Sequence, residues 1–151
     1  NMHQCIKAHS DYINEENIET LQGYDFIFLS LDKGDIKKHI IMFLEQNTIP
    51  FIDVGMGIHN TNGSLTGVLR TTLGDTRKMN FIWKNNVIPF EENDENEYSS
   101  NIQIAELNAL NAAFAVIKWK KIIGYYHDLE DENNSFFRLN SNMITNEKFG
   151  D

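Results

Sequence analysis

The stretch DFIFLSL, residues 25–31, decides the fold, because a nearly continuous apolar run of this length is typical of a strand buried on both faces. A second run, IPFIDV at residues 49–54, has the same character, and its Pro50 stands near the start, where a missing N–H costs least. Residues 36–46 between them repeat apolar side chains at helical spacing, which predicts an amphipathic helix. Strand, helix and strand at this spacing predict a βαβ unit with parallel strands and a right-handed crossover.

Working outward, the three glycines Gly55, Gly57 and Gly63 predict a turn around residues 59–62, followed by a strand over residues 65–73. Upstream, residues 5–9 alternate in a way that suggests a short edge strand. Residues 17–21 suggest one or two helical turns that end at a glycine.

The C-terminal third predicts a long helix and a hairpin. Residues 102–126 carry apolar side chains around most of the helical circumference, which indicates a helix buried on more than one side, either under the sheet or against another subunit. Residues 135–139 and 143–145 flank an Asn-Ser-Asn turn and predict a terminal hairpin. The expected fold class is therefore α/β, in a single domain over residues 1–151.

Composition restricts the partners. The 151 residues carry a formal net charge of -9, which disfavours binding to nucleic acid or to an anionic membrane surface, because both need an excess of lysine and arginine. The one cysteine, Cys5, excludes an intrachain disulfide and a multi-cysteine zinc site. No signal peptide or spanning segment is visible, so a reducing cytoplasm is the expected compartment.

Two aspartates stand out by their positions. Asp32 follows the first buried strand at its carboxyl end, where open α/β sheets place ligand-binding groups; as a bare position it is more often a residue that closes a tight turn. Asp53 lies inside the second strand, so its carboxylate needs a partner, such as a backbone amide or Arg70. A structural role is the expectation for Asp53.

Other chemical motifs are missing or weak. The sequence contains neither G-x-G-x-x-G nor G-x-x-x-x-G-K-[ST], the two glycine patterns that cradle phosphates. Its five histidines show no metal-binding spacing, and the acidic run at residues 92–97 lacks the glycine of a calcium loop. A nucleophile pair of Cys5 and His9 is conceivable, although fraying near a terminus is the more common outcome.

Several short motifs resemble the ThiF/MoeB/HesA family, the adenylyltransferases similar to ubiquitin-activating enzymes. They are DFIFLSLD at residues 25–32 followed by Lys37, IPFIDVG at 49–55, NGSLTGV at 62–68 and NIQIAELN at 101–108. The resemblance implies a Rossmann-like open sheet, partly parallel, with an antiparallel hairpin and a long buried C-terminal helix. It covers residues 5 to 126 and corresponds to the C-terminal half of the family's domain.

The resemblance also implies a chemistry. In that family ATP and Mg²⁺ activate the C-terminal glycine of a small ubiquitin-like or sulfur-carrier protein as an acyl adenylate. Asp32 matches the aspartate that engages the nucleotide and its Mg²⁺, so it is the expected catalytic and metal-binding residue. Lys37 matches a cofactor-binding position that is often arginine, and Lys33 replaces the usual asparagine.

Two departures from the family pattern leave two functional readings open. The glycine loop and phosphate-binding residues that precede residues 6–9 in the family are absent from this sequence, and residues 76–101 contain no cysteine, so no zinc is expected. The chain is then either part of an adenylating enzyme that is inactive without the missing half, or a catalytically silent interaction module. An exposed half-sheet and the apolar helix favour a homodimer in the second reading.

Overall fold

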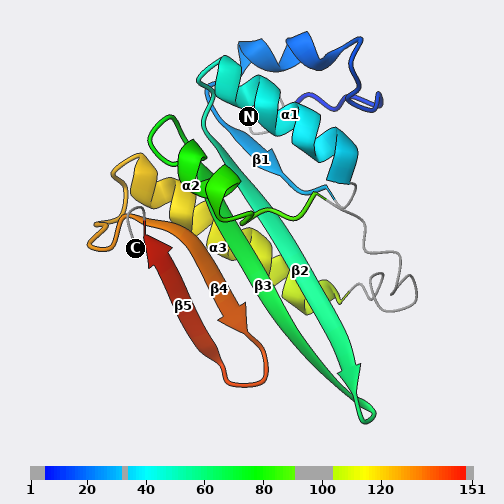
Figure 1. The fold of residues 1–151 in the computed structure, drawn as a ribbon, viewed down its shortest axis with the longest axis vertical. Helices are drawn as coiled ribbons and strands as arrows, with labels where there is room; N and C mark the ends of the chain where they lie inside the picture. Colours follow the sequence, from blue (N-terminus) through cyan, green and yellow to red (C-terminus); the bar gives the residue numbers. More distant parts are fainter. Residues whose placement is uncertain (1–5, 32–33, 91–103, 149–151) are drawn as a thin grey trace.

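The structure is a computed structural model that describes residues 6–31, 34–90 and 104–148. Its centre is an open mixed sheet in the order β1-β2-β3-β4-β5. Helices lie on both faces of the sheet (Figure 1). The α/β class expected from the sequence is therefore confirmed.

The βαβ unit forms as predicted. β1 (Ile27–Leu29) leads into α1 (Gly34–Gln46), which returns the chain to β2 (Phe51–Thr61). β1 and β2 run parallel, with Ile27 opposite Phe51 and Leu29 opposite Asp53. Apolar side chains of α1 pack onto this part of the sheet with Leu29 and Phe51, which explains why both apolar runs become buried strands.

The remaining strands are antiparallel. β2 continues directly into a long hairpin with β3 (Ser64–Gly74), closed by Asn62 and Gly63 at positive φ angles of 54° and 85°. β4 (Glu132–Arg138) pairs with β3, and β5 (Met143–Lys148) pairs with β4. The predicted C-terminal hairpin is confirmed and is longer at both ends.

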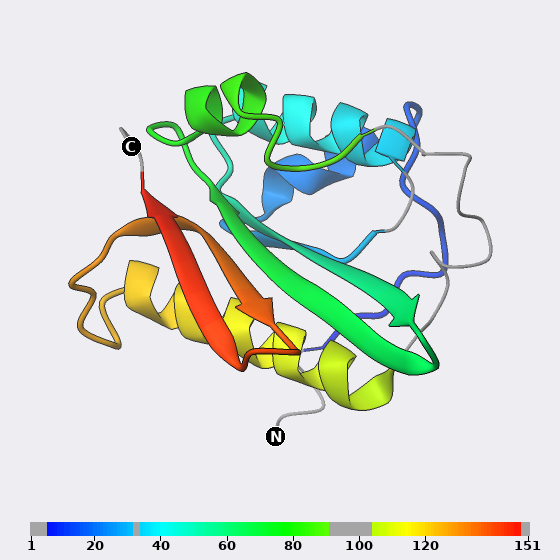
Figure 2. The same ribbon diagram turned by 60° about the horizontal axis from the view of Figure 1, so that its bottom comes forward.

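The helices form two layers around the sheet. α1 and α2 (Met79–Lys84) lie on one face, and α3 (Ala105–Ile122) lies on the other (Figure 2). A six-residue 3-10 helix, η2 (Ile18–Gly23), packs beside α1. The face of the sheet that carries α1 and α2 is called the α1/α2 face below.

Three sequence expectations differ from the structure. Gly55 and Gly57 stay within β2 rather than starting a turn, because strand pairing with β3 continues through both. The described residues 6–9 form no strand. α3 buries only one stripe, Leu107, Asn111, Ala115 and Lys118, so the expected burial on more than one side is not met within this chain.

α3 remains partly exposed because it lies across the outside of the sheet. Its outward side chains Val116, Ile117 and Ile122 are each more than two-fifths exposed. Across the described ranges, none of the helices combines the length and apolar character required to cross a bilayer.

Candidate functional site

Asp53 is the centre of a buried charged cluster on the α1/α2 face. It lies on β2 with 0% of its surface exposed. Lys37 of α1, 5% exposed, places its Nζ 3.1 Å from Asp53 Oδ1, and Arg70 of β3 donates a hydrogen bond to Asp53 Oδ2 at 2.6 Å. The expectation that Arg70 serves as a partner of Asp53 is confirmed. One carboxylate thus faces two cations, and the cluster carries a net charge of +1.

A row of polar side chains extends this cluster across the sheet. Arg70 Nη1 bonds to Thr72 Oγ1 at 2.5 Å, Thr72 Oγ1 to Asn134 Oδ1 at 2.8 Å, and Asn134 Nδ2 to Glu147 Oε2 at 3.0 Å. Strand register aligns the row, because Asp53 pairs with Thr72, Thr72 with Asn134, and Asn134 with Glu147. We call this the interaction row: it runs without a break from Arg70 on β3 to Glu147 on β5, and Asp53 links it to Lys37 of α1.

A glycine makes room for the guanidinium of Arg70. Gly55 lies directly opposite Arg70 in the hairpin, and a Cβ on Gly55 would stand 2.7 Å from Arg70 Nη2. Gly57, two residues further along the same face, has no such neighbour; its Cβ would meet only His59 Nε2 at 3.9 Å. Gly55 thus permits the close approach of Arg70 to the β2 backbone.

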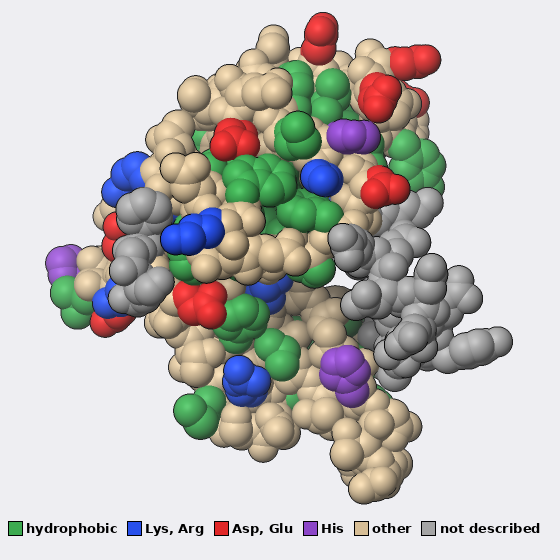
Figure 3. All heavy atoms as spheres, in the orientation of Figure 1, with side chains coloured by type: hydrophobic (Ala, Val, Ile, Leu, Met, Phe, Trp, Pro, Cys, Tyr) green, Lys and Arg blue, Asp and Glu red, His purple; other side chains and the backbone are tan. Residues whose placement is uncertain are grey.

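A cleft of about 400 Å³ opens beside this cluster, and we call it the first cleft. Lys37 and Arg70 supply its charged lining, Leu31 lines it from the segment after β1, and Val87 and Pro89 line it from the segment after α2. Figure 3 shows a hollow on this face beneath the α1 and α2 layer, with basic atoms visible inside it. The arrangement suits an anion, because buried cations with donors to spare are strong partners for phosphate or carboxylate groups.

A second buried ionic cluster lies on the opposite face and joins α3 to β4. Lys118 Nζ is 3.0 Å from Glu132 Oε1 and 3.1 Å from Ser135 Oγ, while Lys121 Nζ is 3.1 Å from Glu132 Oε1. Burial holds the pKa of Lys118 below its ordinary value, and Glu132 offsets this only in part. Burial by itself raises the pKa of Glu132, but the charge of Lys118, a backbone hydrogen bond, and the hydrogen bonds from Lys118 and Lys121 together hold that pKa below the ordinary value. Lys118 of α3 bonds to Glu132 and Ser135, both on β4, so this cluster holds α3 against β4.

The structure describes only some of the residues that the sequence predicts for the site. Asp32, the expected catalytic and Mg²⁺-binding residue, lies outside the described residues. Lys37, the expected nucleotide-binding residue, lines the first cleft. The described histidines His9, His39, His59 and His127 are exposed; within the described ranges no three His, Cys, Asp or Glu side chains gather as metal ligands would.

Sequence reasoning missed Thr72, Asn134 and Glu147. They are separated by up to 75 positions and come together only through the register of two antiparallel pairings, β3 with β4 and β4 with β5. The only local signal was that Thr72 lies two residues after Arg70, on the same face of β3. Compared with known proteins, the chain matches no family model, and no curated protein sequence matches it.

Proposed function

We propose that this chain supplies one side of the nucleotide site of an ATP- and Mg²⁺-dependent adenylating enzyme of the ThiF/MoeB/HesA kind. The substrate is the C-terminal glycine of a small ubiquitin-like or sulfur-carrier protein, in the cytoplasm. The observation that carries the proposal is the position of the first cleft, next to the carboxyl end of β1 and to the part of β2 just beyond its parallel pairing with β1. Open α/β sheets bind their ligands at that end of the strands.

The charges of the first cleft support an anionic ligand. Lys37 and Arg70 share the single carboxylate of Asp53, so one positive charge is left for a phosphate or carboxylate group. Arg70 is held by Asp53 and Thr72 and is therefore preorganised, which lowers the cost of binding. We also propose that the fold is related to the Rossmann fold, on the basis of the βαβ unit formed by β1, α1 and β2.

Each residue has a distinct role in this proposal. Asp32 holds the Mg²⁺ that accompanies the nucleotide, and its neighbour in sequence, Leu31, lines the first cleft. Lys37 contacts the anionic ligand, while Asp53 and Arg70 fix the position of Lys37 and the charge of the cleft. Because residues 1–151 contain no phosphate-cradling glycine loop, that loop comes from another polypeptide segment.

Isothermal titration with Mg-ATP tests the proposal on the protein encoded by the complete reading frame and on residues 1–151. We expect binding by the complete protein, loss of binding in Asp32→Ala, and at least tenfold weaker binding in Lys37→Met. Lys37→Arg should retain affinity because it keeps the charge, and Lys38→Ala, an exposed neighbour, is the matched control. Failure of the complete protein to bind, or unchanged binding by Asp32→Ala, contradicts the proposal.

A specific observation favours a second candidate, a dimerisation module without catalysis. Within the described part of the chain β1 pairs only with β2, so its other edge is open. Phe28 of β1 is 47% exposed and packs against Phe26 and Trp119, with ring centroids 5.2 and 6.2 Å away. A groove of about 380 Å³ lies between β1, at Phe28, and α3. An open strand edge next to exposed aromatic surface is suited to pairing with a second copy.

A further inference from the structure

A second cleft lies on the face of the sheet that carries α3, opposite to the first cleft. It is lined by β3, β4 and β5 and by the second half of α3, and its volume is about 240 Å³. An apolar cavity of about 150 Å³ is large enough to bind benzene. The second cleft therefore has room for one ring with a short chain attached to it.

Strand register divides the wall of the second cleft into two neighbouring rungs, one apolar and one polar. The apolar rung consists of three directly opposed side chains on β3, β4 and β5, which are Leu69, Phe137 and Ile144. The polar rung, two residues away along each strand, consists of Thr71, Ser135 and Asn146. The rungs are about 7 Å apart, because a strand rises about 3.3–3.4 Å per residue.

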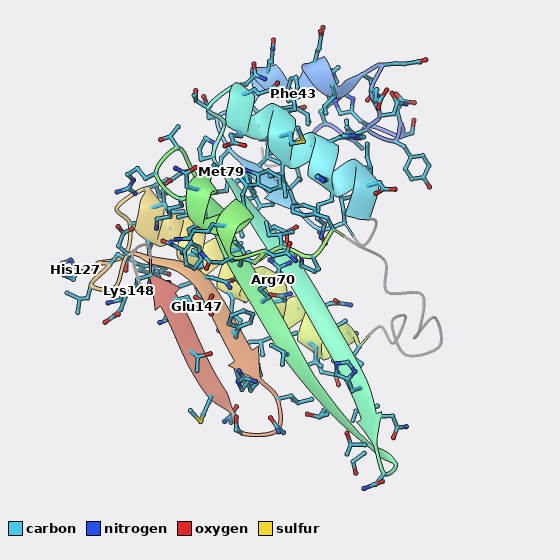
Figure 4. The ribbon with its side chains drawn as sticks, in the orientation of Figure 1. Phe43, Arg70, Met79, His127, Glu147 and Lys148 are labelled. Atoms are coloured by element: carbon cyan, nitrogen blue, oxygen red, sulfur yellow. The ribbon has the colours of Figure 1, made fainter. Side chains whose placement is uncertain are left out.

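Helix α3 extends both rungs. The ring centroid of Phe114 lies 5.9 Å from that of Phe137, on the apolar rung. Lys118 places its Nζ 3.1 Å from Ser135 Oγ, on the polar rung, and Lys121 follows about one turn later on the helix. Lys148, labelled in Figure 4, marks the end of β5 nearest to the polar rung. The second cleft is therefore amphipathic, with its lysines at one end.

Lys121 can offer its charge to a ligand. Its side chain is 23% exposed, and its Nζ lies 3.1 Å from Glu132 and 3.4 Å from Asp128. The carboxylate of Asp128 also accepts hydrogen bonds from the backbone N–H groups of Glu130 and Asp131, at 3.1 and 3.2 Å. Asp128 therefore keeps two partners when Lys121 turns to a ligand, so the longer of these two ion pairs can be exchanged.

Two neutral donors lie at the same end of the second cleft. The Ser135 hydroxyl accepts a hydrogen bond from Lys118, and within the described ranges neither its own proton nor the Asn146 carboxamide has another partner. Ser135 and Asn146 are directly opposed on β4 and β5, so their side chains lie about 5 Å apart. Two lysines and one glutamate line the second cleft, which gives the lining a net charge of +1. This charge and these donors complement a carboxylate.

We propose that the second cleft binds a small monocarboxylate with an apolar body, of the class of the phenyl-substituted short-chain acids. The ring packs on the apolar rung, and the carboxylate lies at the polar rung, where Lys121, Ser135 and Asn146 hold it. The inference goes beyond the proposed function and does not rest on it, because the two clefts lie on opposite faces of the sheet and share no lining residue.

Ligand titration tests the inference with ω-phenylbutanoate, whose ring and carboxylate are separated by about the distance between the rungs. Its neutral amide, ω-phenylbutanamide, and the cation ω-phenylbutylammonium keep the ring and change the charge. Each is titrated into the ¹⁵N-labelled protein, and backbone amide shifts are followed by NMR. We expect the carboxylate to bind with a Kd on the order of 1 mM, the amide about threefold to fivefold more weakly, and the ammonium most weakly.

Single variants assign the binding to the second cleft. Lys121→Met should remove the preference for the carboxylate over the amide, whereas Lys120→Met, at the adjacent position on α3, should keep it. Ile144→Gln should weaken both ligands to the same extent, because it alters the apolar rung. Met143→Gln is the control for Ile144→Gln: both residues are 55% exposed, and the side chain of Met143 points to the other face of β5.

The ratio of the two affinities separates ligand binding from a structural role of Lys121. Loss of a purely structural ion pair would lower the thermal stability of Lys121→Met and leave the ratio unchanged. A preference for the carboxylate that survives in Lys121→Met, equal binding of the acid and the amide by the wild type, or no saturable binding overturns the inference. Shift changes that are confined to the first cleft also overturn it, because the carboxylate then binds beside Lys37 and Arg70.

Discussion

Asp53 is the shared carboxylate partner of two buried cations, and this makes it the most sensitive single residue of the α1/α2 face. In Asp53→Asn, Lys37 and Arg70 lose their carboxylate while they remain buried. Breaking a buried ion pair from one side costs about 3–5 kcal/mol, so we expect the free energy of unfolding to fall by about that amount. Urea denaturation followed by circular dichroism measures it.

The control for this prediction is Asp11→Asn, which makes the same chemical change at an exposed position. Its effect should stay within about 0.5 kcal/mol. A loss of less than about 1 kcal/mol in Asp53→Asn would show that the cations find water or other partners.

Gly55 and Gly57 offer a matched comparison on one strand. An alanine at Gly55 forces the Arg70 guanidinium to move away from Asp53, and two hydrogen bonds oppose that movement. We expect Gly55→Ala to lower the free energy of unfolding by about 1–3 kcal/mol, and Gly57→Ala to change it by less than about 0.5 kcal/mol. Thermal unfolding of the two variants, measured side by side, tests this difference. Equal losses of stability would mean that the Arg70 side chain can move away from residue 55 at no cost.

Local sequence could predict part of this cluster. Asp53 stands in an apolar strand, so its need for a partner follows from desolvation, and Arg70 was the nearest cation on the following strand. Lys37 was reached by resemblance to a family motif, and its contact with Asp53 was not foreseen. Asn134 lies 62 positions from Thr72, and only strand register, which no local pattern encodes, brings them together.

At the level of secondary-structure elements, Glu132 of β4 holds α3 in place through its ion pairs with Lys118 and Lys121. The pKa of Glu132 makes these ion pairs sensitive to acid. The folded-state pKa of Glu132 lies below the ordinary value of 4.5 because the charge of Lys118, a backbone hydrogen bond, and the hydrogen bonds from Lys118 and Lys121 together outweigh burial. A lowered carboxyl pKa contributes stability above the unfolded-state pKa, and this is lost as pH falls through the folded-state pKa. We therefore expect the contribution of Glu132 to be complete above pH 4.5 and to decline below it.

The variant Glu132→Gln separates the contribution of Glu132 to stability from the contributions of the other carboxylates. At pH 7 the variant should be less stable than wild type by about 3 kcal/mol, because Lys118 stays buried without its charge partner. The difference should shrink towards pH 3, where the wild-type side chain becomes protonated. Denaturant unfolding at several pH values measures both chains, and a difference independent of pH would contradict the assignment.

Element type was easier to predict than element extent. The βαβ unit and the terminal hairpin follow from apolar runs and turn residues. β2 extends seven residues beyond Val54, because glycines inside a paired strand resemble turn glycines when only the sequence is considered. α3 seemed buried all round, but tertiary position decides which of its apolar side chains meet the sheet.

On the scale of the whole molecule, the open edge of β1 is the surface through which the proposed dimerisation module would pair with a second copy. Phe28→Lys places a charge on that edge and should raise the dissociation constant of a homodimer at least tenfold. Tyr12→Lys, at an aromatic residue that is 92% exposed, is the matched control. Sedimentation velocity over a concentration series measures both; a monomeric wild-type chain, or an unaffected Phe28→Lys dimer, would remove support for the dimerisation module.

The interaction row also has a polarity, since every proton in it is donated in the same direction. It starts at Arg70, which can only donate, passes through Thr72 and Asn134, and ends at Glu147, which in its ionised form only accepts. The row therefore fixes the hydroxyl rotor of Thr72 and the amide orientation of Asn134, because reversing either would leave two donors or two acceptors facing each other. Successive bonds of the same sense polarise one another, so each bond of the row is stronger than it would be alone.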